Sequence, residues 1–111
     1  MPAMDSDTDN PLLVVTTVGS REEALSLARA LVEMRLAACA QVGAIHSVYR
    51  WHGVVHDEPE FRVLFKTRAA RYAQVEAAIR ERHPYELPAI HAIATAHAEA
   101  AYAAWVADNA G

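Results

Sequence analysis

The sequence is poor in cysteine, and its single thiol is that of Cys39. One cysteine cannot form a disulfide within the chain, so a small secreted scaffold held by disulfides is excluded. Long apolar runs are also missing. Hydrophobic residues make up 53% of the 111 residues, yet no run approaches the ~20 residues of a membrane-spanning helix. We therefore expect no association with a membrane.

Basic residues are scarce as well. Ten Lys and Arg face fourteen Asp and Glu, for a net charge of −4, and no basic stripe exists, which argues against nucleic acid as a partner. Residues 1–11 are acidic and lack the basic and apolar regions of a signal peptide. We expect a disordered acidic tail over 1–11, one domain over 12–111, and a cytoplasmic location.

Two segments show helical spacing, and a third follows near the end of the chain. Ser20 and Glu23 form a capping box before the first, and Thr67 is placed to cap the second. Glu99 is expected to open the last helix. The residues expected on the buried faces are Ala24, Leu27, Ala28, Leu31 and Met34, then Tyr72, Val75 and Ile79, and finally Tyr102, Trp105 and Val106.

Strands are indicated by β-branched runs and by alternation. Residues 12–18 resemble a central strand, and 89–96 a further one. Between them, 38–67 alternates with a period of two and predicts an unusually long β-hairpin that turns at His52-Gly53. Gly43 predicts a bulge or bend, and Pro59 an edge strand or a bulge.

The predicted order is β-α-β-β-α-β-α, an α+β class. Its first six elements form the ferredoxin-like βαββαβ sandwich, here with a long central β-hairpin and an extra C-terminal helix. The two main helices would cover one face of the sheet. The other face would be left bare with Tyr49 and Trp51 on it, which favours self-association.

Four blocks of the sequence carry a family resemblance. They are RLAACA at 35–40, IHSVYRWHG at 45–53, EPE at 58–60 leading to FKT at 65–67, and HPYELP at 83–88. Together they are similar to the CutA family, the divalent-cation-tolerance proteins, over roughly residues 12–106. The resemblance implies a ferredoxin-like fold, a tight homotrimer, and an association with copper and other divalent cations. The family trimer is similar to that of the PII signalling proteins, but a shared fold does not transfer function.

The chain departs from the family pattern at one position. Where the family usually has a glutamate after the HPYE block, this chain has Ala89, so a carboxylate ligand is missing there. A site with several thiolates from one chain is also excluded, because Cys39 is the only cysteine.

Cys39 and His83 are the candidate metal ligands. A thiolate suits Cu(I), although a lone cysteine is more often a small buried hydrophobe. His83 lies at a predicted helix C-terminus before Pro84, where it could bind copper, transfer protons, contact an anion or cap the helix. The expected cofactor is copper, as Cu(I) or Cu(II), or another divalent cation, with no organic cofactor.

A second group of residues is expected in a cleft between subunits. Aromatic residues at a period of two more often pack than react, and charged residues on a strand are often only solvated. Because these residues fall in the family blocks, contacts between subunits or with a ligand are an alternative for both the aromatic and the charged residues. This group comprises Tyr49, Trp51, Glu58, Glu60, Lys66, Tyr85 and Glu86.

Three functions follow, in order of preference. The first is a trimeric divalent-cation-tolerance protein that binds copper or a related ion. The second is a sensor of small ligands in PII-like trimer clefts. The third is an acid/base enzyme using His83, Tyr85, Glu86 and Lys66, ranked last because the sequence carries no nucleophile elbow, phosphate loop or zinc pattern. The expected partner is a second copy of the chain, and no downstream partner can be named.

Overall fold

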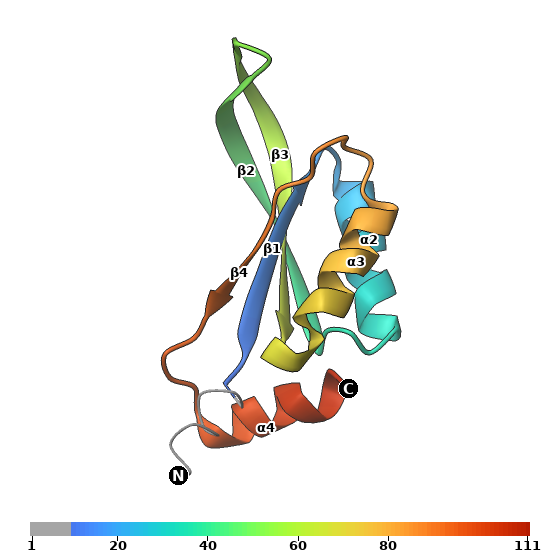
Figure 1. The fold of residues 1–111 in the computed structure, drawn as a ribbon, viewed down its shortest axis with the longest axis vertical. Helices are drawn as coiled ribbons and strands as arrows, with labels where there is room; N and C mark the ends of the chain where they lie inside the picture. Colours follow the sequence, from blue (N-terminus) through green and yellow to red (C-terminus); the bar gives the residue numbers. More distant parts are fainter. Residues whose placement is uncertain (1–9) are drawn as a thin grey trace.

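In the computed structural model, residues 10–111 form a four-stranded antiparallel sheet in the order β2-β3-β1-β4, with two helices packed on one face (Figure 1). β1 (Leu12–Val18) lies between β3 (Val54–Thr67) and β4 (Ile90–Ala94), and β2 (Cys39–Trp51) forms the far edge. The covering helices are α2 (Arg21–Glu33) and α3 (Tyr72–Arg82). This arrangement confirms the predicted ferredoxin-like α+β fold.

The core lies between the sheet and the two helices. Val14 and Val18 of β1, and Val63 and Phe65 of β3, point toward α2 and α3 and are almost fully buried. Ser20 caps α2 by accepting from the backbone N–H of Glu23, as the capping box predicted. Met34 is 45% exposed, so its predicted place on the buried face of α2 was wrong. Met34 falls after the last full turn, where the chain leaves the core.

The hairpin of β2 and β3 is the longest feature of the molecule and projects beyond the helices (Figure 1). Its turn is His52-Gly53, with φ of 49° and 77° as a tight hairpin turn requires, which confirms the prediction. Pairing runs without interruption from Cys39–Lys66 to Trp51–Val54. The predicted bulge at Gly43 is therefore wrong. Pro59 lies where β3 has passed the end of β1 and pairs with β2 alone, so β3 is an edge strand at this point, as the proline predicted.

The start of α3 differs from the prediction. Thr67 is still part of β3, and its buried hydroxyl donates to the carbonyl of Leu36 at 2.7 Å rather than capping a helix. A short 3₁₀ turn, η1 (Ala69–Arg71), leads into α3. Tertiary pairing of β3 with β1 through Thr67 extends the strand past the local capping signal.

The last helix, α4 (Ala100–Asn109), packs across the end of the sheet away from the hairpin tip (Figure 1). Glu99 caps it, as predicted, by accepting from the backbone N–H of Tyr102. Val106 is buried, but Tyr102 and Trp105 are 37% and 47% exposed. Their predicted burial is therefore wrong for a single chain.

Residues 1–9 of the predicted tail lie outside the described residues. The last two residues of the predicted tail are hydrogen-bonded to the segment after β4. The carbonyl of Pro11 accepts from the Thr95 hydroxyl at 2.6 Å, and the Asn10 side-chain amide donates to the Thr95 carbonyl. None of the helices in residues 10–111 combines the length and apolar character needed to cross a membrane.

Candidate functional site

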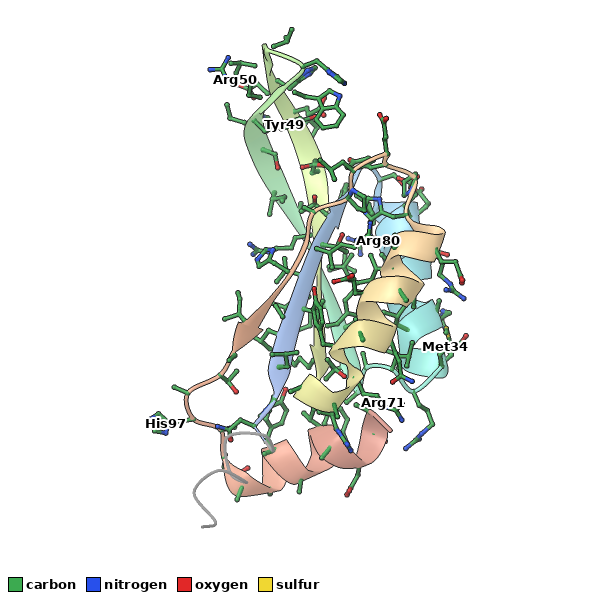
Figure 2. All side chains as sticks on the ribbon, in the orientation of Figure 1. Met34, Tyr49, Arg50, Arg71, Arg80 and His97 are labelled. Atoms are coloured by element: carbon green, nitrogen blue, oxygen red, sulfur yellow. The ribbon has the colours of Figure 1, made fainter. Side chains whose placement is uncertain are left out.

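The projecting part of the hairpin and the loop from α3 to β4 enclose an open groove of about 980 Å³, the hairpin groove. It brings together six of the seven residues predicted for a cleft, namely Tyr49, Trp51, Glu58, Glu60, Tyr85 and Glu86. Figure 2 shows Tyr49 on the part of the hairpin that extends past the sheet. The remaining lining residues are Thr17, Ser47, Val48, Leu87, Pro88, Ala89, Ile90 and His91.

Two tyrosine–glutamate hydrogen bonds organise the groove. The Tyr85 hydroxyl donates to the carboxylate of Glu60 at 2.7 Å and so ties the α3–β4 loop to β3. The Tyr49 hydroxyl donates to Glu58 across the hairpin. Glu58 raises the pKa of Tyr49 to about 12, mainly through that hydrogen bond. Burial, followed by the bond to Glu60, raises the pKa of Tyr85 well above its ordinary value. Both phenols therefore stay protonated donors at neutral pH.

His83 does not line the groove but contacts Tyr85, which does. Its Nδ1 accepts from the backbone N–H of Tyr85 at 3.1 Å, so its Nε2 carries the proton that Thr17 O accepts at 2.7 Å. Its ring also makes an edge contact with the Tyr85 ring, 4.8 Å between centroids. Both nitrogens are thus already engaged in one neutral tautomer. His83 holds Tyr85 in place, and a metal ion could use it only by breaking one of these bonds.

Cys39 and Lys66 lie at the other end of the sheet, where they pair across β2 and β3. Lys66 Nζ lies 5.5 Å from the centre of the Tyr102 ring of α4, and the Tyr102 hydroxyl raises the pKa of Lys66. The acid/base enzyme considered from the sequence would use Lys66 together with His83, but one chain does not bring the two side chains together. His83 contacts β1 at Thr17, whose partner on β3 is Arg62, four residues along the strand from Lys66. Only the tertiary register decides this separation.

Residues 10–111 of one chain do not provide a chelating site for a metal ion. Across residues 10–111, no three His, Cys, Asp or Glu side chains converge as a metal site would require. Cys39 is half-buried beside Lys66, and His83 is at the opposite end of the sheet. The two predicted ligands therefore cannot bind the same ion within one chain.

Sequence reasoning missed the apolar wall of the groove, formed by the loop residues Leu87, Pro88 and Ile90. The signal available was their position directly after the HPYE block. Ala89, the departure from the family pattern, also lines the groove.

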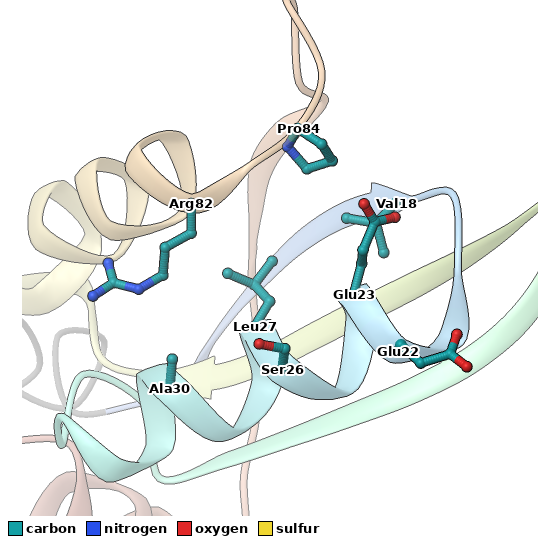
Figure 3. Close-up of a pocket in the computed structure, with 8 residues that line it drawn as sticks. All are labelled: Val18, Glu22, Glu23, Ser26, Leu27, Ala30, Arg82 and Pro84. Carbon is teal, nitrogen blue, oxygen red and sulfur yellow. The ribbon is translucent and has the colours of Figure 1, made fainter.

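A second pocket, of about 470 Å³, lies between α2 and the end of α3 (Figure 3). Glu22 and Glu23 stand toward one end, and Arg82 extends from α3 toward the other. None of the predicted site residues lines it. Arg82 is engaged with the Ala78 carbonyl and with Glu81, so this pocket carries no organised ligand set comparable to the hairpin groove.

Comparison with known proteins places this geometry in a family. The family model described as CutA1 divalent ion tolerance protein matches residues 12–109. The chain belongs to the CutA1 family. The "Divalent-cation tolerance protein CutA" of Thermus thermophilus is 38% identical over 100 residues, which cover 89% of this chain and 97% of that protein. The protein of the same description from Thermotoga maritima is 33% identical over 98 residues, covering 88% and 97%.

Solved structures of the CutA1 family have the same fold. CutA from Synechococcus elongatus superimposes with a TM-score of 0.89 at 33% identity, covering 95% of this chain and 94% of that one. The Thermus thermophilus Cut A1 structure gives 0.87 at 36% identity, covering 91% and 99%. These relatives are named for tolerance of divalent cations and not for a known enzymatic reaction. The resemblance seen in the four sequence blocks is thereby confirmed.

Proposed function

We propose that this protein acts in divalent-cation tolerance in the cytoplasm, as a homotrimer that binds copper or a related metal ion. The observation that carries the proposal is the match of residues 12–109 to a family named for tolerance of divalent ions. Binding of the ion is the simplest physical route from that family name to a function. The ion is cargo here, and no reaction is assigned to it.

Assembly into a trimer is supported by the uncovered face of the sheet. Within residues 10–111, α4 reaches the face that carries Leu13 and Leu64 at Lys66, and the α3–β4 loop reaches it at Glu60, but no helix or strand covers this face over its length. Ile93 on the same face is 48% exposed. Tyr49 and Trp51 continue this face along the hairpin, 38% and 37% exposed. Apolar surface of this extent is normally buried in an interface, and a second copy of the chain would supply the cover.

Metal binding by the assembly is consistent with the separation of Cys39 and His83. Because no three ligands converge in the described part of one chain, we propose that an ion is held by ligands from more than one subunit. Cys39 is the soft ligand suited to Cu(I), and His83 is the candidate imidazole at the groove. Loading at His83 would require the Thr17 or the Tyr85 hydrogen bond to open.

The test is a titration of the protein with copper, zinc and cobalt, with the oligomeric state measured by light scattering alongside. We expect about three times the 12.1 kDa mass of one chain, stoichiometric copper binding, and weaker binding in Cys39→Ser or His83→Ala. His97→Ala is the matched control, because His97 is exposed and lies at the end of the molecule away from the hairpin tip (Figure 2).

Each outcome bears on a separate part of the proposal. Loss of binding in His97→Ala equal to that in His83→Ala would identify scavenging by surface histidines and contradict a specific site. Parent-like binding in both Cys39→Ser and His83→Ala would show that the ligands are wrongly assigned. A monomer in light scattering would contradict the trimer.

The hairpin groove favours a second candidate, a sensor of small ligands. A groove of about 980 Å³ is within the size of sites that hold small organic molecules. Its hydrogen-bonded tyrosines and glutamates offer fixed polar contacts. This candidate predicts ligand binding that is unchanged when metal is removed, whereas the first predicts binding of the metal itself.

A further inference from the structure

Arg35 has a backbone conformation that is unfavourable for a residue with a side chain. Its φ is 59°, and it directly follows Met34, the C-cap of α2. The Arg35 N–H donates to the Val32 carbonyl at 3.0 Å. The Leu36 N–H donates to the Leu31 carbonyl, also at 3.0 Å. These two hydrogen bonds form the Schellman pattern, in which glycine usually takes the left-handed position. An arginine at this position therefore needs a compensating contact.

The Arg35 side chain makes that contact with the carboxyl end of α4. Its Nε donates to the main-chain oxygen of Gly111 at 2.9 Å, and its Nη2 donates to the Asp108 carbonyl at 2.6 Å. The last carbonyls of a helix have no partner within the helix, and they carry its partial negative charge. A guanidinium group suits this end of a helix, because it is always cationic and donates from several N–H groups at once.

A second arginine contacts the same end of α4. Arg71, the last residue of η1, donates from Nε to the Ala110 carbonyl at 3.0 Å, and Figure 2 shows it beside this end of the helix. Its Nη1 donates to Gln74 of α3 at 2.8 Å, which fixes the direction of the guanidinium group. Neither Arg35 nor Arg71 forms an ion pair with a carboxylate of residues 10–111. The two arginines together form a latch on α4.

Apolar packing within one chain holds α4 less firmly than it holds the other two helices. α2 buries four of its residues and α3 buries three, whereas α4 buries Val106 alone. A helix of ten residues is marginal in water unless tertiary contacts stabilise it. The hydrogen bonds of the latch are charge-assisted and therefore stronger than ordinary ones. They should supply a large share of the free energy that keeps α4 on the end of the sheet.

We propose that α4 is a strap that opens as a unit, and that Arg35 and Arg71 control its opening. The left-handed backbone of Arg35 is retained because it places the guanidinium group over the end of α4. Opening releases Lys66, whose Nζ lies 5.5 Å from the centre of the Tyr102 ring. The proposal does not rest on metal binding or on a trimer. Both arginines belong to segments that join the sheet to α2 and α3, and not to its uncovered face.

The test is hydrogen–deuterium exchange, read by mass spectrometry, on the full chain in its native assembly. In Arg35→Gly we expect the amides of 104–109 to exchange about tenfold faster or more, because both charge-assisted hydrogen bonds are lost. Arg71→Gln should act in the same direction. Peptides from α2 and α3 should keep the rates of the parent. Glycine also removes the backbone penalty at Arg35, so faster exchange in α4 is an effect of the lost side chain.

Arg29→Gln is the matched control, because Arg29 is an exposed arginine of α2 that pairs with Glu33 and not with α4. It should leave the exchange of α4 unchanged. Parental exchange of α4 in both Arg35→Gly and Arg71→Gln would overturn the proposal, because packing within the chain or against another copy would then hold the helix. Equal acceleration in α2, α3 and α4 would also overturn it, since that result describes unfolding of the whole domain.

Discussion

Two buried threonines show how a single hydroxyl acts at the scale of one residue. Thr16 and Thr67 are both fully buried on the helix-covered face of the sheet. The Thr67 hydroxyl donates to the Leu36 carbonyl at 2.7 Å, whereas the Thr16 hydroxyl has no hydrogen-bond partner in residues 10–111. A buried hydroxyl stabilises only when it is paired.

We therefore expect opposite effects from the same substitution. Thr67→Val leaves the Leu36 carbonyl unpaired and should lower the free energy of unfolding by about 1–3 kcal/mol. Thr16→Val removes an unpaired polar atom at nearly constant volume and should raise it by up to about 1 kcal/mol. Urea denaturation at one fixed protein concentration measures both. A loss of stability in Thr16→Val equal to that in Thr67→Val would contradict the assignment of the hydrogen bonds.

At the scale of elements, the α3–β4 loop is fastened to the hairpin and to β1 by a few side chains. Tyr85 reaches Glu60 of β3, and His83 reaches Thr17 of β1. The sequence predicted where α3 ends, because Pro84 cannot follow a helical residue easily. It could not predict that Tyr85 points back to β3, since that direction depends on a contact between residues 25 positions apart.

The contribution of Tyr85 to the free energy of unfolding should depend on pH in one direction. The pKa of Tyr85 is raised in the folded chain, so its contribution to stability is complete below the ordinary tyrosine pKa, about 10, and is lost as pH rises through the folded value. The parent should therefore lose stability more steeply than Tyr85→Phe as pH rises above about 10. Urea denaturation across that range measures the difference between the two.

Ultraviolet titration of the tyrosines provides the control. Tyr49→Phe should remove a component with a pKa of about 12, and Tyr85→Phe should remove a component that titrates above its ordinary range. If Tyr85→Phe leaves the high-pH end of the titration unchanged, neither the burial of Tyr85 nor its hydrogen bond to Glu60 is maintained in solution.

At the scale of the whole molecule, the two faces of the sheet differ in how far they are covered. α2 and α3 cover one face, and no element of residues 10–111 covers the other over its length. Ile93 of β4 belongs to the uncovered face and Leu25 to the outer side of α2, and the two are 48% and 47% exposed. A single chain should tolerate a charge at either position.

Assembly into a trimer should make the two positions respond differently to an introduced charge. If the uncovered face is the trimer interface, Ile93→Glu should shift the protein toward monomer by burying an unpaired charge, and Leu25→Glu should leave the trimer intact. Light scattering over a dilution series measures both variants, and circular dichroism shows whether each chain remains folded. Dissociation by Leu25→Glu with an intact Ile93→Glu trimer would place the interface on the helix side instead.

The sequence by itself determined the order of the elements, the long hairpin with its His52-Gly53 turn, and the family. These features rest on local periodicity, on turn residues with φ above zero and on contiguous motifs, which are all encoded within a few residues. The tertiary structure alone decided which site residues meet. It joined Tyr85 and Glu60 with Tyr49 and Glu58 in one groove and placed Lys66 with Cys39 at the opposite end. Strand register and loop direction fix those distances, and both arise from pairing between residues far apart in the chain.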